Sequence, residues 1–466
     1  AKEGDDWAKD MVGLLQKSLY GTRDAARNFQ REVNMFMQRN GFSVGKYDVC
    51  TFYNEKLGIR TLVHGDDFLA TGPMSGLKQF EKYMKATYEC KVEEIGVGKK
   101  DDKVLRVLGR IVEITEEGVT YEPDQRHVEA VCSKLGLSLE KSGSCASPWE
   151  REVFPKGEAM RSREARTKAG GRQEGEVGDE RRTNGTGESV SSDPAPGSGT
   201  KFREGAYCGP METEQDAPKT GGGGEEEQLE GEAKTEYQSM SARLNYLAMD
   251  RADLQFGVKE LMRKMAGPTK KDWKALKRVA RYCLGAPRIV QKFDWSERAN
   301  DLIIHVDSDF AGCQTTRKST SGGCISWGKA TLKTWSKTQS VIALSSGEAE
   351  LAAMIRGATE AMGMQSVLKD FGIWVKLVIR SDASAAIGMV KREGRGKVRH
   401  LAVADLWIQE KRARGEMAFE KVDGEANPAD MMTKGVNGEK IERFCKVPGF
   451  EKKEERHEQA PEFREK

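Results

Sequence analysis

Several features that mark secreted or membrane proteins are missing from this sequence. No run approaches the roughly 18 consecutive apolar residues that a membrane-spanning helix needs. The first residues, Ala1 to Asp6, are charged and have no apolar core, so they do not form a signal peptide. The nine cysteines include no pair at C-x-x-C spacing and no histidine at zinc-ligand spacing, which favours reduced thiols. We therefore expect a protein of the cytoplasm or nucleus with no membrane partner.

An excess of one charge sign is lacking as well. The 76 Lys and Arg residues nearly balance the 73 Asp and Glu residues, leaving a net charge of +3. Only local charge runs can therefore indicate a partner. The chain begins at Ala1 without an initiator Met, so we expect it to start inside a longer reading frame.

Apolar residues are scarce in the middle of the chain. Residues 157–234 contain sixteen glycines but only four Leu, Ile, Val or Phe residues. Such a stretch cannot bury enough apolar surface to offset the entropy of ordering, so we predict a disordered linker. The predicted order is an α+β domain, a linker, a basic helical connection, an α/β domain and a polar tail: 1–150, 151–234, 235–298, 299–436 and 437–466. We expect the last sixteen residues of this tail to be frayed.

The first domain shows helical and hairpin patterns. Residues 24–39 repeat apolar side chains at helical spacing. Residues 51–72 alternate as a hairpin that turns at Gly65, Asp66 and Asp67, and residues 104–122 read as a second hairpin. These elements predict a small sheet with at least one covering helix.

A run of positive charge follows the linker. Residues 255–292 contain eleven Lys or Arg residues and only two acids, in a region that we expect to be helical. A solvated helix face is the usual meaning of such a run. The imbalance favours a surface that contacts phosphate groups, with Lys274, Lys277 and Arg281 as its centre.

Four acids fall at informative places in the α/β domain. Asp307 and Asp382 end predicted strands, Glu350 lies in the first turns of a helix, and Asp430 follows a turn proline. Carboxylates that meet at the carboxyl ends of strands repel one another unless a cation neutralises them. Oxygen ligands favour Mg²⁺ or Mn²⁺, and two such ions about 3.5–4 Å apart can act on a phosphodiester. Alone, each acid is more often a solvated loop carboxylate, so only the group of four is specific.

The motifs around these acids resemble the ribonuclease H domain of copia-type retrotransposon polyproteins. The matching runs, in order, are HVDSDFAG (305–312), RKSTSGG (317–323), ALSSGEAELAA (343–353), IRSDASAAI (379–387), RHLAVADLWIQE (399–410) and NPADMMTKG (427–435). They cover about 130 residues with the order and spacing of the family. The resemblance implies a ribonuclease H-like fold, with a mixed sheet and flanking helices. It also implies that this domain cuts the RNA strand of an RNA–DNA hybrid.

The same resemblance assigns roles to single residues. It implies that Asp307, Glu350, Asp382 and Asp430 bind two Mg²⁺ or Mn²⁺ ions. Glu350 is chosen over Glu348 because the run Leu-Ala-Ala follows it, as it follows the family's catalytic glutamate. Asp309, Glu348 and His400 are expected to have structural or supporting roles. Arg317 and Lys318 are expected to contact nucleic acid.

The N-terminal domain resembles the reverse transcriptase of the same polyproteins. The runs KSLYG (17–21) and VHGDDF (63–68) are similar to a family helix and to the hairpin that carries its paired catalytic acids. The resemblance implies that Asp66 and Asp67 belong to a truncated palm and thumb without fingers. Because a third polymerase acid would lie upstream, we expect no polymerase activity from this chain alone. The missing N-terminal part of the polyprotein is a possible partner.

Two other hypotheses fit the same sequence. The chain could be an inactive remnant that binds hybrid or single-stranded nucleic acid through its basic connection. It could also have been recruited for a host interaction through its linker and acidic run. Four intact acids favour the enzyme, because neutral drift tends to remove at least one of them.

Overall fold

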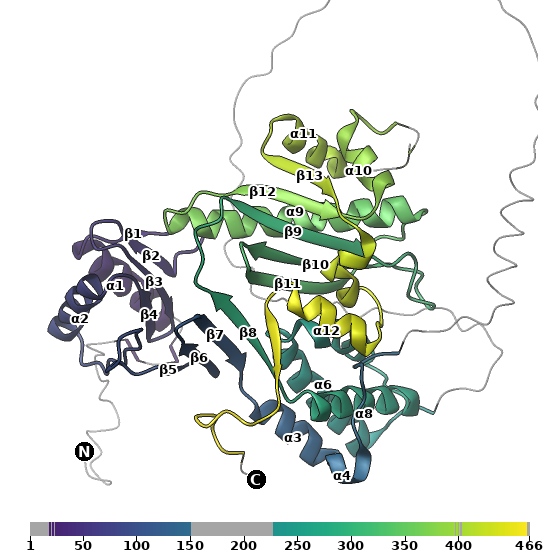
Figure 1. The fold of residues 1–466 in the computed structure, drawn as a ribbon, viewed down its shortest axis with the longest axis horizontal. Coiled ribbons are helices and arrows are strands. Elements are labelled where there is room, and N and C mark those ends of the chain that lie inside the picture. The colour runs from purple at the N-terminus through teal and green to yellow at the C-terminus, as the bar shows by residue number, and fades with distance from the viewer. Residues whose placement is uncertain are drawn as a thin grey trace, which may run out of the picture. The chain divides into compact units, whose positions relative to one another are not determined.

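The computed structural model describes the chain on both sides of one long gap (Figure 1). The described residues are 18–19, 21–22, 24–150, 227–396, 398, 400 and 403–463. Most of the predicted linker, residues 151–226, lies outside them. The last part of the linker prediction is wrong, because helix α6 (Gly231–Ala248) already begins at Gly231 and buries Tyr237 and Met240.

A four-stranded antiparallel sheet forms the first part of the chain. Its order is β1-β2-β3-β4, from Ser43–Val44, Thr51–Asn54, Ile59–His64 and Asp67–Thr71. Helices α1 (Ala25–Arg39) and α2 (Met74–Thr87) contribute Phe36 and Phe80 to the core of this sheet. The predicted helix and hairpin are confirmed, and Gly65 supplies the left-handed backbone of the turn, with φ of 61°.

A second antiparallel sheet combines three distant segments. Its order is β14-β8-β7-β6-β5, from Phe450–Lys453, Arg288–Asp294, Gly118–Pro123, Arg110–Ile114 and Val104–Val107. The predicted hairpin over residues 104–122 is confirmed. Two expectations differ from the structure: part of the basic run is strand β8 rather than helix, and residues 450–453 pair with β8 instead of fraying.

A helical core lies beside this second sheet. Its helices are α3 (Arg126–Lys134), α4 (Leu139–Ser142), α6, η2 (Ala252–Leu254), α7 (Gln255–Met262), α8 (Lys270–Gly285) and α12 (Gly438–Lys446). A capping box of Thr269 and Asp272 begins α8. Helix α12 corrects the predicted polar tail, because it buries Ile441, Phe444 and Cys445 along one face. The predicted domain boundaries themselves stay predictions.

The third sheet is mixed, and the four candidate acids lie on one of its strands and on the segments that surround it. Its order is β11-β10-β9-β12-β13, from Ala330–Thr338, Thr320–Trp327, Asp301–Ser308, Lys376–Ser381 and Met417–Lys421. Strands β9 to β11 form an antiparallel meander, and β12 and β13 run parallel to β9. The helical segments of this part are α9 (Ser346–Asp370), α10 (Ser384–Lys391), η3 (Val403–Leu406), α11 (Trp407–Ala413), η4 (Gly424–Ala426) and η5 (Pro428–Met432). Figure 1 shows α9 running along the sheet.

Across the described ranges, every helix is too short or too polar to cross a bilayer.

Candidate metal and nuclease site

Two parallel strands deliver the first two acids to one edge of the mixed sheet. Strands β9 and β12 are hydrogen-bonded neighbours, and Arg380 pairs with His305. Two residues further along each strand lie Asp382 and Asp307. The carboxyl ends of parallel strands meet at the same edge, so this register brings the two carboxylates together.

Helix α9 delivers the third acid. Ser345 caps this helix by accepting a hydrogen bond from the backbone N–H of Glu348 at 3.3 Å. Glycine at position 357 lets α9 approach the sheet, because a Cβ there would lie only 2.5 Å from Val306 Cγ1. Glu350, in the first turns of the helix, is therefore held against the end of β9.

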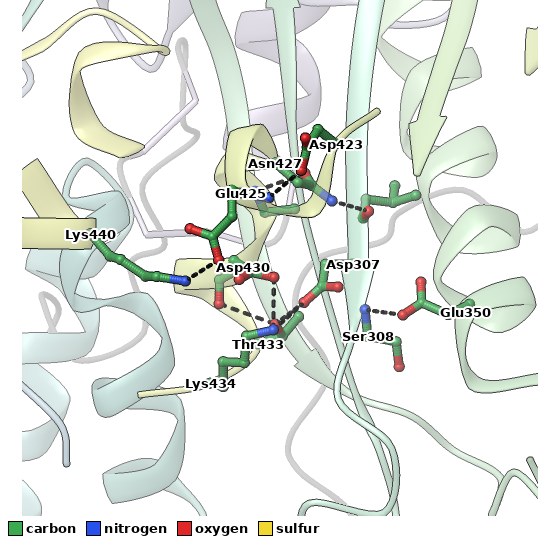
Figure 2. Close-up of polar contacts among 12 residues, drawn as sticks. Asp307, Ser308, Glu350, Asp423, Glu425, Asn427, Asp430, Thr433, Lys434 and Lys440 are labelled. Atoms are coloured by element: carbon green, nitrogen blue, oxygen red, sulfur yellow. Dashed lines mark hydrogen bonds and ion pairs between the residues drawn. The ribbon is translucent and has the colours of Figure 1, made fainter. Parts of the chain in front are cut away.

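The three acids converge. One carboxylate oxygen from each of Asp307, Glu350 and Asp382 lies within 4.8 Å of the other two. Figure 2 shows Glu350 beside the backbone N–H of Ser308, which donates to Glu350 Oε1 at 3.3 Å. The second oxygen, Glu350 Oε2, is buried and has no hydrogen-bond partner. A buried carboxylate oxygen without a partner is costly, so this geometry fits a ligand that supplies positive charge.

The fourth acid lies next to this group. Asp430 is on η5, which the fully buried Asn427 caps. The amide of Asn427 donates to Val306 O at 2.9 Å and fastens η5 to β9. Lys434 Nζ lies 2.8 Å from Asp430 Oδ1 and 3.8 Å from Asp307 Oδ2, and the hydroxyl of Thr433 donates to Asp307 (Figure 2).

The electrostatics of these groups are perturbed together. Burial, followed by the charges of Asp307 and Asp382, raises the pKa of Glu350 to about 9. Burial, then Asp307, raises the pKa of Asp430 to about 6, and burial, then Asp430, raises the pKa of Asp382. Burial alone would lower the pKa of Lys434, but the surrounding carboxylates raise it. Perturbed pKa values of this kind are typical of functional sites.

The donor set fits a hard divalent cation. Asp307, Glu350 and Asp382 offer carboxylate oxygens only, which Mg²⁺ and Mn²⁺ prefer over softer metals. Burial, followed by the neighbouring carboxylates, raises the pKa values of Glu350 and Asp382, and one Glu350 oxygen has no partner, so a bound cation would relieve a cost at this position.

The supporting residues take structural positions. The carboxylate of Glu348 accepts from the backbone N–H of Leu344 at 3.0 Å and contacts His400 Nε2 at 2.8 Å. Asp309 accepts from the backbone N–H of Thr320, which ties the loop after β9 to β10. These contacts agree with the supporting roles expected for the three residues.

The predicted polymerase acids lie elsewhere, in the turn between β3 and β4. Asp66 and Asp67 are both exposed, and His64 pairs with Asp67 at the end of the hairpin. Within the described ranges, the group of three or more side chains able to share a metal ion is the one at Asp307, and it includes neither Asp66 nor Asp67.

The predicted nucleic-acid contacts are spread over two elements. Lys274 and Lys277 are exposed on α8, whereas Arg281 is half-buried and its Nε donates to Gly143 O at 3.4 Å. Arg317 is exposed, and with the half-buried Lys318 it lies in the loop that leads into β10.

Two residues near the acids were not expected from the sequence to contact the site. Thr433 and Lys434 belong to the run NPADMMTKG, and both reach Asp307. Their signal in the sequence was weak, because a threonine and a lysine after a short turn have many ordinary uses. Their spacing of three and four residues from Asp430 was the only available indication.

The curated proteins that this chain resembles include Pol polyproteins of transposons. No protein-family model matches the chain. The chain is 30% identical over 217 residues to the "Retrovirus-related Pol polyprotein from transposon TNT 1-94" of Nicotiana tabacum, which covers 46% of this chain and 16% of that protein. It is 28% identical over 220 residues to the corresponding polyprotein from transposon RE2 of Arabidopsis thaliana, with 46% and 15% covered. The chain thus spans about a sixth of the length of these relatives.

A solved structure resembles part of the chain. LC11-RNase H1, isolated from compost, aligns over 29% of this chain and 93% of its own, at 16% sequence identity and a TM-score of 0.20. The family assignment therefore depends on the sequence matches.

Proposed function

Because this chain belongs to the retrovirus-related Pol polyproteins of copia-type retrotransposons, we propose that residues 299–436 form a ribonuclease H domain that cuts the RNA strand of an RNA–DNA hybrid. The observation that carries the proposal is the convergence of Asp307, Glu350 and Asp382 at one sheet edge, with a buried and unpartnered oxygen on Glu350. Metal-assisted phosphodiester cleavage explains three converging acids beside a fourth, Asp430, better than a structural role does.

Asp307, Glu350 and Asp382 would hold a divalent cation, Mg²⁺ or Mn²⁺. When bound, this cation supplies counter-charge and polarises the phosphodiester. The protein contributes rigid placement: β9 and β12 fix two carboxylates through their register, and α9 fixes the third through its cap at Ser345. Preorganised charges of this kind stabilise developing negative charge without reorganising.

The hybrid would be held by positive charge around the acids. Arg317 and Lys318 precede β10, whose Gly322 pairs with Asp307, so their loop is on the same side of the sheet as the acids. Lys274 and Lys277 add exposed charge on α8. We expect these residues to contact phosphates rather than bases, because a processing nuclease must accept many sequences.

Residues 1–150 are proposed to be a reverse-transcriptase segment that does not polymerise alone. Asp66 and Asp67 lie in one exposed turn, so they can approach a metal from one side only. Within the described ranges, no third His, Cys, Asp or Glu side chain joins them in a group that could hold a metal ion, and phosphoryl transfer needs its ions held from several sides.

A substrate comparison tests the proposal. The chain is incubated with Mg²⁺ and labelled RNA–DNA hybrid, single-stranded RNA or duplex DNA, and each is repeated with a chelator. We expect cleavage of RNA in the hybrid alone, and none with the chelator. Tight hybrid binding without cleavage would instead support the alternative of a nucleic-acid-binding remnant.

A further inference from the structure

A lysine lies between the fourth acid and the group of three. Lys434 Nζ is 2.8 Å from Asp430 Oδ1 and 3.8 Å from Asp307 Oδ2, so it lies between these two acids (Figure 2). The group able to share an ion contains Asp307, Glu350 and Asp382 but not Asp430. The four acids therefore divide into three that meet and one that is paired with an ammonium.

The backbone around Lys434 is fixed on both sides. Before it, the hydroxyl of Thr433 binds Asp307. After it, Gly435 packs so closely against Trp149 and Glu150 that a Cβ would lie 2.9 Å from the carbonyl oxygen of Glu150. Close packing of this kind leaves little freedom for the main chain, so the lysine is held where its side chain reaches the acids.

We infer that the ammonium of Lys434 is the second cation of this site, so that the substrate-free protein binds one divalent ion, at Asp307, Glu350 and Asp382. The inference rests on the proposed metal site, and it replaces the second of the two ions that the sequence resemblance implies. A fixed ammonium neutralises Asp430 and turns one oxygen of Asp307 away from a second ion, since like charges that close exclude each other.

Removing the ammonium should open the second position. In Lys434→Met the side chain keeps much of its length but loses its charge, which leaves Asp430 and Asp307 uncompensated. Two carboxylates freed in this way form an oxygen site that a divalent ion can fill. The side chain of Lys434 is 41% exposed, so an ion from solvent can reach that position.

The test counts Mn²⁺ ions bound to the full-length, metal-free chain by electron paramagnetic resonance, with the count for Asp307→Asn subtracted as background. We expect one ion for the natural chain and two for Lys434→Met. Lys434→Arg, which keeps the charge, should bind one. Lys440→Met is the matched control: Lys440 pairs with Glu425 at 2.8 Å instead of with the four acids, so this variant should also bind one.

Two ions on the natural chain would overturn the inference, because a second divalent ion would then displace the ammonium of Lys434. An unchanged count in Lys434→Met, with the variant folded by circular dichroism, would also overturn it. Cleavage of hybrid by the natural chain, measured on the same samples, tests the proposed nuclease function separately: an inactive chain that shows the expected counts contradicts that function and supports the inference.

Discussion

Replacing Glu350 by glutamine should stabilise the metal-free protein. Burial, then the charges of Asp307 and Asp382, raises the pKa of Glu350 from 4.5 to about 9. Between these values the folded state holds a proton that the unfolded state has lost, so stability falls as the pH rises through this window. Glutamine is nearly isosteric and does not ionise, and its carbonyl can still accept the hydrogen bond from Ser308.

The size of this stabilisation depends on how far the pH lies above the pKa of Glu350 in the unfolded state. At pH 7 this difference is about 2.5 units from the unfolded value of 4.5, and each unit corresponds to about 1.4 kcal/mol. The substitution should therefore add on the order of 3 kcal/mol to the free energy of unfolding, or several degrees in Tm. The gain should be larger at pH 8 and nearly absent at pH 5.

Thermal unfolding measures both parts of this expectation. With a chelator present, Glu350→Gln should unfold at a higher temperature than the natural chain. With Mg²⁺, the natural chain should gain stability by binding the ion, and the variant should gain much less.

Glu348→Gln is the matched control, two residues earlier on the same helix. Burial opposes its charge, but the contact with His400 and hydrogen bonds from Leu344 and Ser345 lower its pKa overall. Its charge therefore stabilises the fold above the unfolded pKa, and its removal should lower the Tm at pH 7. If Glu350→Gln unfolded at a lower temperature than the natural chain with chelator present, the claim that gathering acids at this edge destabilises the metal-free fold would be refuted.

Three further expectations follow from the structure. Asn427→Ala removes a fully buried amide that fastens η5 to β9, and should cost about 1–3 kcal/mol by chemical denaturation and reduce hybrid cleavage. Reversing the charges of Lys274, Lys277 and Arg281 together should weaken the binding of unrelated duplexes equally and make their affinity depend less on salt concentration. An unchanged salt dependence would mean that these side chains form only a solvated face of α8. Primer extension on a primed RNA template should give no product even in Mn²⁺, and product that disappears in Asp66→Asn would contradict the incomplete polymerase.

Local patterns predicted the elements that carry the candidate site. Apolar runs that end in an acid predicted β9 and β12, and Glu350 was expected in the first turns of the helix that is α9. The same patterns predicted the turn at Gly65. Each of these signals lies within a few residues of the element it specifies, so no tertiary contact was needed to find it.

Long-range pairing explains what the sequence did not reveal. Strand β14 is the polar run FEKK, which forms only because β8 offers its edge more than 150 residues away in the sequence. Helix α12 has the spacing Ile441, Phe444 and Cys445, a helical signal that a polar composition obscured. Local patterns did not predict the position of Lys434, because this lysine lies between Asp430 and Asp307 only once η5 has packed in the folded chain.

The central claim is tested most directly by following the RNA strand of a labelled RNA–DNA hybrid in Mg²⁺ with three chains. The natural chain should cleave it, and Asp307→Asn should reduce the rate by orders of magnitude while keeping the fold. Asp301→Asn, at the opposite end of the same strand β9, should cleave like the natural chain. Cleavage by Asp307→Asn at the natural rate, or no cleavage by a folded natural chain, would contradict the assignment.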